Sequence, residues 1–259
     1  MASTYIFDSD GLKTLANCIQ PNTLFAFNLD STLRVEETTY DNSHTNEQIR
    51  DTIKRLNLLT KVAVFTGASR GNALAALGFE PSILVGRHGA EWSNAHAKRN
   101  WNQVILCLKW QERLYDILGH QRAIKIAFNG ESIEICHREA DDPEQALSHI
   151  KAAIKELDPL PQSFWNKTSV SLLPPDTLTK ERLVVAVKEK LGARQVIFLS
   201  DDEADEDIFK TKEIDVLSIY IGQNGHTKAR YYLRKKSALL GLLNSMVGIL
   251  EPQVATNQL

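Results

Sequence analysis

The sequence predicts an α/β protein whose core is a parallel β-sheet with helices on both faces. Short apolar runs typical of buried strands alternate with helix-like stretches near both ends of the 259-residue chain. In the middle, a long helical pattern precedes two strand-like runs joined by Asn129-Gly130, a strong signal for a β-hairpin. We therefore predict a doubly wound, Rossmann-like parallel-sheet core formed by residues 1–96 and 176–259, with an α+β cap domain, residues 97–175, inserted into it.

The core elements follow from apolar periodicity and from glycines that end helices. The predicted core strands are 24–27, 61–65, 82–85, 195–199 and 216–221, and the predicted core helices are 46–59, 73–77 and 180–191. Gly78 and Gly192 end two of these helices, because glycine readily adopts the left-handed conformation of a helix C-terminus.

The inserted domain has antiparallel rather than alternating character. Its predicted elements are helices 101–118 and 143–157 and strands 123–128, 132–136 and 169–173. After them the chain returns to the pattern of the core. The last residues, 251–259, are predicted to be a frayed tail.

The composition excludes several classes of protein. Lys and Arg number 30 against 32 Asp and Glu, so no basic field is available for nucleic acid or anionic lipid. No apolar run approaches the roughly 20 residues of a membrane span, and the N-terminus does not resemble a secretion signal. The spacing of Cys18, Cys107 and Cys136 suggests plain thiols rather than disulfides or a zinc site. We expect a cytoplasmic protein, a monomer or weak dimer, with no nucleic-acid or membrane partner.

Polar side chains follow two predicted strands at the point where each strand ends. Asn28 and Asp30 come after strand 24–27, and Asp201 comes after strand 195–199. The carboxyl ends of parallel strands form the ligand-binding edge of such a sheet. Oxygen ligands from two strand ends suit Mg²⁺. The alternative is an Asx-turn in which the side chains of Asn28 and Asp30 only satisfy the loop backbone.

Further residues reach the same edge. Thr66 and Gly67 follow strand 61–65 and could bind a phosphate oxygen through a hydroxyl and a backbone N–H, and Lys180 could add a positive charge. The stretch that begins at Asp201 contains six acidic residues. We expect those after Asp202 to form the acidic first turn of a helix, and we assign Asp201 to the metal.

These residues match a known set of motifs. The matching passages are Asn28-x-Asp30-x-Thr32-Leu33, Thr66-Gly67, Gly86-Arg87-His88-Gly89-Ala90-Glu91, Lys180, Asp201-Asp202-Glu203-Ala204-Asp205-Glu206-Asp207-Ile208-Phe209 and Thr227-Lys228-Ala229-Arg230-Tyr231-Tyr232-Leu233. In this order they resemble the haloacid dehalogenase superfamily of phosphatases, and more narrowly the trehalose-6-phosphate phosphatase family. The match extends over nearly the whole chain.

The resemblance implies a Mg²⁺-dependent phosphatase that acts on a sugar phosphate, trehalose 6-phosphate above all. Position 28 would take the phosphoryl group, and Asp30 would be the general acid and then the base. Thr66, Gly67 and Lys180 would hold the phosphoryl oxygens. The implied metal ligands are Asn28, Asp30, Asp201 and Asp202, and the implied substrate contacts are Gly67, Arg70, His88 and Arg138. His88 could also be a structural histidine beside a glycine turn.

The sequence departs from the family at its central residue. Asn28 stands where the family has aspartate, and a neutral amide cannot form an aspartyl phosphate. Three explanations stay open: a substitution that traps substrate, a natural protein without catalysis, or a mistaken motif.

Other functions also stay open. One alternative is a regulatory domain that binds a sugar phosphate without hydrolysing it, and another is a phosphatase for a different glycosyl phosphate. A third is an α/β-hydrolase, because Gly67-Ala68-Ser69-Arg70-Gly71 is a G-x-S-x-G sequence and Ser69, Asp201 and His226 stand in the required order. We expect Ser69 to be a helix N-cap instead.

Overall fold

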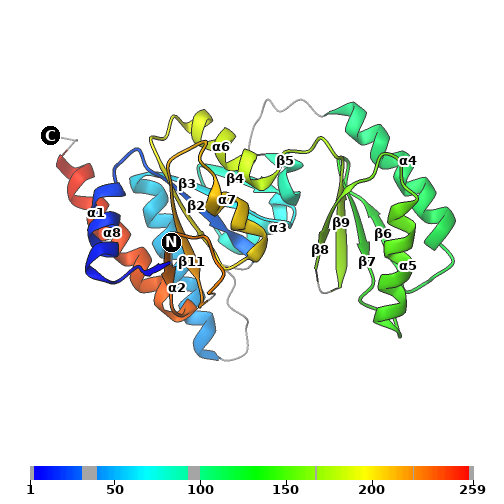
Figure 1. Cartoon of the computed structure of the whole chain (residues 1–259), viewed down its shortest axis with the longest axis horizontal. Helices are drawn as coiled ribbons and strands as arrows, with labels where there is room; N and C mark the ends of the chain where they lie inside the picture. Colours follow the sequence, from blue (N-terminus) through cyan, green and yellow to red (C-terminus); the bar gives the residue numbers. More distant parts are fainter. Residues whose placement is uncertain (1–2, 31–39, 93–99, 167, 224, 257–259) are drawn as a thin grey trace. The chain divides into compact units, whose positions relative to one another are not determined.

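The computed structural model describes residues 3–30, 40–92, 100–166, 168–223 and 225–256, although not the side chains of residues 40–46. The chain forms two compact units (Figure 1). One combines Met1–Ser93 with Leu178–Leu259, and the other is Asn94–Thr177. These limits lie within three residues of the predicted domain boundaries.

The first unit is built on one eight-stranded sheet. Its strands, in spatial order, are β1 (Thr4–Tyr5), β12 (Tyr231–Leu233), β11 (Val216–Ile221), β10 (Val196–Ser200), β2 (Leu24–Asn28), β3 (Lys61–Phe65), β4 (Ile83–Gly86) and β5 (Glu91–Trp92). All neighbours are parallel except β5, which runs antiparallel to β4. The central strands β2 and β10 are buried along their whole length, as continuous apolar runs predict.

Helices pack on both faces of this sheet. The long helices are α1 (Ser9–Cys18), α2 (Tyr40–Leu59), α6 (Lys180–Leu191) and α8 (Leu239–Thr256), and the shorter ones are α3 (Arg70–Leu77) and α7 (Glu206–Lys210). Successive side chains of β2 point to opposite faces of the sheet and pack in two different hydrophobic clusters. Phe25 and Phe27 pack with α1, α2, α3 and α8, whereas Leu24 and Ala26 pack with α6 and α7. The predicted doubly wound core is therefore confirmed.

The apolar helix α8 belongs to the core. Among the described residues it is the one helix that is long and apolar enough to cross a membrane. Its buried residues are Leu239, Leu242, Leu243, Met246, Val247 and Leu250. Because the core helix of a soluble protein meets the same criteria, this is weak evidence for a membrane span. The predicted frayed tail is wrong as far as Thr256, because the helix continues to that residue. Residues 257–259 lie outside the described part of the chain.

The second unit has its own sheet and core. Strands β6 (Lys125–Phe128), β7 (Ile133–Cys136), β9 (Ser169–Leu173) and β8 (Gln162–Trp165) are antiparallel in that order. Helices α4 (Trp101–Leu118) and α5 (Pro143–Lys155) share a buried cluster with them. This is the predicted α+β insertion. Burial raises the pKa of the Cys107 thiol in this core to about 12, so the thiol stays protonated.

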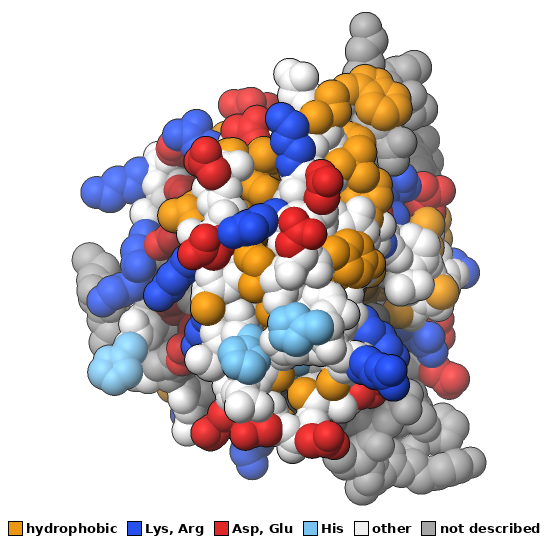
Figure 2. Space-filling view, turned by 90° about the vertical axis from the view of Figure 1, so that its right-hand side faces the viewer, with side chains coloured by type: hydrophobic (Ala, Val, Ile, Leu, Met, Phe, Trp, Pro, Cys, Tyr) orange, Lys and Arg blue, Asp and Glu red, His pale blue; other side chains and the backbone are white. Residues whose placement is uncertain are grey.

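One face of the molecule agrees with the balanced composition. On the face shown in Figure 2, basic and acidic side chains lie among one another rather than in separate blocks. That face therefore carries no large field of one sign.

Candidate active site

Three neighbouring strands end at the place where the predicted site residues lie. Strand β2 pairs with β10 on one side and with β3 on the other. Their carboxyl ends therefore deliver Asn28, Thr66 and Ser200 to one edge of the sheet. Asn28 is only 3 % exposed, so its amide must find partners within the protein.

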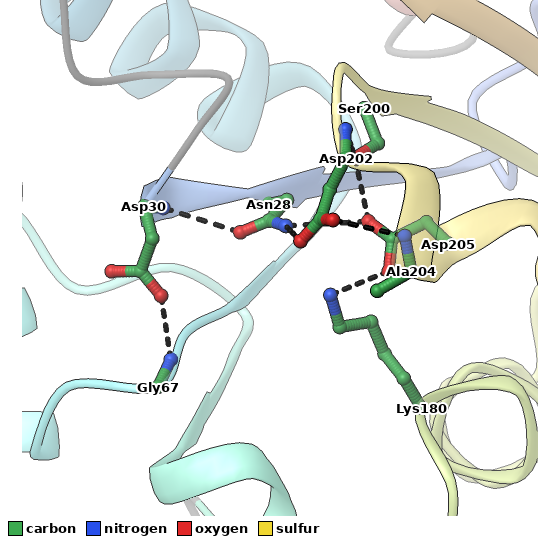
Figure 3. Close-up of polar contacts among 8 residues, drawn as sticks. All are labelled: Asn28, Asp30, Gly67, Lys180, Ser200, Asp202, Ala204 and Asp205. Carbon is green, nitrogen blue, oxygen red and sulfur yellow. Dashed lines mark hydrogen bonds and ion pairs between the residues drawn. The ribbon is translucent and has the colours of Figure 1, made fainter. Parts of the chain in front are cut away.

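The amide of Asn28 contacts two carboxylates (Figure 3). Its Nδ2 donates to Oδ2 of Asp205 over 3.2 Å and to Oδ2 of Asp202 over 3.5 Å. Its Oδ1 accepts the backbone N–H of Asp30 over 3.2 Å. The nitrogen of this amide, rather than its oxygen, therefore faces the acidic cluster.

Asp205 is the most deeply buried carboxylate of the site. It is 0 % exposed, and Lys180 Nζ lies 2.5 Å from its Oδ1. The Ser200 hydroxyl donates to its Oδ2 over 2.5 Å. A buried carboxylate is stable only with such partners. Lys180 therefore compensates the charge of Asp205 and is itself held in the site.

Asp30 is held by the residues that follow β3. The Thr66 hydroxyl donates to Oδ1 of Asp30 over 2.8 Å, and the backbone N–H of Gly67 donates to Oδ2 over 2.6 Å. Figure 3 shows the carboxylate of Asp30 turned toward Gly67. Two donors thus converge on one anionic group at the end of β3.

His88 packs directly against this turn. It has a positive φ of 52°, and its backbone N–H donates to the carbonyl of Thr66 over 3.1 Å. A Cβ on Gly67 would lie 2.6 Å from Nε2 of His88, which explains the glycine. Burial, and then the positive charge of Lys180, lowers the pKa of His88 to about 4. The imidazole is therefore neutral at pH 7.

This lowered pKa predicts an acid-sensitive fold. The folded state prefers neutral His88, so its contribution is present above the ordinary pKa of 6.5 and is lost as the pH falls through about 4. We expect the free energy of unfolding to fall by up to about 3 kcal/mol across this window. Urea unfolding at several pH values measures it. His88→Asn, which tolerates positive φ, should remove this part of the pH dependence, whereas exposed His120→Asn should retain it.

The structure does not bring all predicted residues together. Arg70 pairs with Glu80, with 3.9 Å between Nη2 and Oε1. Asp201 pairs with Lys236, with 3.7 Å between Oδ2 and Nζ, and it is Asp202 that contacts Asn28. Arg138 is exposed and belongs to the second unit. Thr32 and Leu33 lie outside the described residues.

Sequence reasoning gave no role to two residues of this network. Ser200 accepts the N–H of Asp202 and donates to Asp205, and its place directly before the acidic run was the available signal. Lys236 forms an ion pair with Asp201. Only the basic run 234–236 hinted at a cation there.

The donors present do not fit the predicted magnesium set. No three His, Cys, Asp or Glu side chains within the described ranges are grouped to hold a metal ion. The N–H groups of Asn28 point at Asp202 and Asp205, and a metal needs oxygen lone pairs there.

The structure confirms two predictions about single motifs: the helix N-cap at Ser69 and the helix start in the acidic run after Asp202. Ser69 is the N-cap of α3, and its hydroxyl accepts the N–H of Asn72, as expected. The acidic run after Asp202 begins a helix, because Asp202 accepts the N–H of Ala204 and a 3₁₀ turn continues into α7. The α/β-hydrolase alternative therefore loses its nucleophile.

No family model matches the sequence, and no curated protein matches it either. Solved structures do match. Aspergillus fumigatus trehalose-6-phosphate phosphatase is 18 % identical, with a TM-score of 0.64 over 95 % of this chain and 99 % of that chain. The C-terminal domain of the Candida albicans trehalose synthase regulatory protein is 14 % identical, with a TM-score of 0.63 over 93 % and 99 %.

Sucrose-phosphatase from Synechocystis, solved with sucrose and phosphate, is 16 % identical, with a TM-score of 0.57 over 88 % of this chain and 98 % of that chain. These similarities extend over both units of the chain. The α/β core with its inserted α+β unit therefore has the fold of the haloacid dehalogenase-type sugar phosphatases, and it resembles trehalose-6-phosphate phosphatase.

Proposed function

We propose that this chain binds a phosphorylated sugar at the carboxyl ends of β2, β3 and β10, and that hydrolysis there requires aspartate at position 28. One observation supports the binding proposal above all. Thr66 and Gly67 already hold an anion, the carboxylate of Asp30. A phosphoryl group offers the same kind of acceptor oxygens to these donors.

The ligand expected to enter this site is a sugar phosphate. Its phosphoryl oxygens exchange with the Asp30 carboxylate on Thr66 and Gly67, and Lys180 supplies a nearby positive charge. Trehalose 6-phosphate is the first compound to test, because the resemblance in motifs and fold points to it. Sucrose 6-phosphate represents the other glycosyl phosphates. The Mg²⁺ requirement that the resemblance implies is proposed only for a form with aspartate at position 28.

A regulatory role is the second candidate. Asn28 supports it, because an amide leaves the rest of the network intact without supplying a nucleophile. The similarity to a regulatory protein domain points in the same direction. A regulatory domain would bind the sugar phosphate but would gain no turnover from Asn28→Asp.

Calorimetric titration tests the binding proposal directly. Trehalose 6-phosphate should bind with a stoichiometry of one, and Asp30→Ala should bind inorganic phosphate about tenfold or more tightly than the parent, because the internal competitor is gone. Thr66→Val should weaken the binding of both ligands.

The matched control removes a carboxylate that touches neither donor. Asp207 is exposed and pairs only weakly with Lys210, at 3.4 Å, so Asp207→Ala should bind phosphate as the parent does. Equal affinities in the parent and in Asp30→Ala would contradict the exchange. An absence of sugar-phosphate binding in every variant would contradict the proposed function.

A further inference from the structure

The acidic cluster at the end of β10 is compensated by the chain itself. Lys180 lies on Asp205 at 2.5 Å, and Lys236 lies on Asp201 at 3.7 Å. Asn28 donates to Asp202 and to Asp205. Each of the three carboxylates therefore has a donor from another element of the same unit.

The hydrogen-bond network fixes the orientation of the Asn28 amide. Its oxygen accepts the N–H of Asp30, and its nitrogen meets two carboxylate oxygens. A flipped amide would place its oxygen against those two carboxylates and its NH₂ group against an N–H donor. Both contacts would be repulsive. Position 28 thus presents hydrogens where a metal site would need lone pairs.

We propose that Asn28, Lys180 and Lys236 together take the place of a divalent cation, so that this chain recognises its phosphorylated ligand without Mg²⁺. The part that concerns the ligand rests on the proposed function. The part that concerns the metal rests on the contacts alone and is measured without any ligand.

The residue at position 28 decides the metal requirement. Aspartate there would set a third carboxylate beside Asp202 and Asp205, at the distances now occupied by amide hydrogen bonds. Neighbouring carboxylates disfavour each other's ionised form unless a cation compensates them. Asn28→Asp should therefore create a site that Mg²⁺ occupies.

Lys236 offers a second, milder change. Its side chain is 29 % exposed and that of Asp201 is 23 % exposed, so the pair lies at the rim of the cluster. Lys236→Ala leaves Asp201 without this cation and should produce weak Mg²⁺ binding even with Asn28 present. Lys235 is exposed and adjacent, so Lys235→Ala is the matched control.

The experiment is a Mg²⁺ titration of the full chain, monitored by calorimetry and by thermal unfolding. NaCl at matched ionic strength is the control for general salt effects. The parent and Lys235→Ala should give no saturable heat and a melting shift below about 1 °C. At a Mg²⁺ concentration about 100 times its dissociation constant, Asn28→Asp should gain roughly 5 °C or more. Circular dichroism verifies that each variant folds.

A parent chain that binds one Mg²⁺ ion, and loses it in Asp201→Asn, would overturn the proposal even if Asn28→Asp fails to fold. Phosphate or trehalose 6-phosphate binding to the parent that disappears with EDTA would overturn it as well. If neither ligand binds with or without Mg²⁺, the proposed function fails, while the metal titration still decides the inference about the cation.

Discussion

Under the proposed function, replacing Asn28 with aspartate should give this chain phosphatase activity. With Mg²⁺ in the buffer, release of inorganic phosphate from trehalose 6-phosphate should rise by at least about 10³-fold over the parent chain. A carboxylate at position 28 can attack phosphorus, and an aspartyl phosphate forms as the bond to the sugar oxygen breaks. In the proposed reaction, Asp30 in its protonated form would give its proton to that oxygen and would then take one from the water that cleaves the acyl phosphate.

The control for this gain supplies no nucleophile at position 28. Asn28→Ala should release no phosphate, and Asn28→Asp combined with Asp30→Asn should lose most of the gained turnover. Sucrose 6-phosphate and other glycosyl phosphates complete the substrate panel. A folded Asn28→Asp variant that binds these compounds but hydrolyses none of them would favour the regulatory role.

Replacing Lys180 with alanine should strongly destabilise the first unit. Asp205 is 0 % exposed, and the substitution removes the lysine that pairs with its carboxylate. Removal of one partner from such a pair costs about 3 kcal/mol or more of the free energy of unfolding. Urea unfolding followed by circular dichroism measures this loss.

Two further variants separate charge from other effects of Lys180→Ala. Arg182 is exposed on the same helix, α6, and Arg182→Ala should change the free energy of unfolding by no more than about 0.5 kcal/mol. Lys180→Ala combined with Asp205→Asn should recover part of the loss, because the unpaired charge is gone. A loss below about 1 kcal/mol in Lys180→Ala alone would mean that Ser200 and Asn28 hold Asp205 without the lysine.

Much of the fold could be predicted, because strong local signals mark the ends of many core helices and strands. Helix 180–191 was predicted at its observed limits, since Thr179 caps its start and Gly192 ends it in the left-handed conformation. Strands 61–65 and 216–221 were also predicted at their limits, as continuous apolar runs.

Other elements could not be predicted from local sequence. Strands β1, β5 and β12 have two or three residues each and exist only through pairing with neighbours. Helix α8 was not predicted, although its buried residues recur at helical spacing: Leu239, Leu242, Leu243, Met246, Val247 and Leu250. Pro252, a residue that disfavours a helix interior, hides the continuation of the helix to Thr256.

The sheet edge at which these residues meet could be predicted from the sequence. The pairs that their side chains form could not. Strand ends place Asn28, Thr66 and Asp201 at one edge of the sheet, which is a consequence of parallel topology. Whether Asp201 or Asp202 meets Asn28 depends on side-chain directions in the turn after Ser200. Lys236 reaches Asp201 from a segment 35 residues later, and no spacing rule connects the two.

The contacts of the Asp30 carboxylate with Thr66 and Gly67 affect the concentration at which a ligand binds. An internal occupant makes ligand entry an exchange, so the apparent affinity is the intrinsic affinity reduced by the fraction of molecules whose donors are vacant. Free inorganic phosphate must overcome this competition with the contacts of the phosphoryl group alone, whereas a sugar phosphate adds the contacts of its sugar. If the chain binds a phosphorylated sugar as proposed, the exchange lowers both apparent affinities by the same factor. Background phosphate can then fall below its apparent dissociation constant while the tighter sugar phosphate still binds.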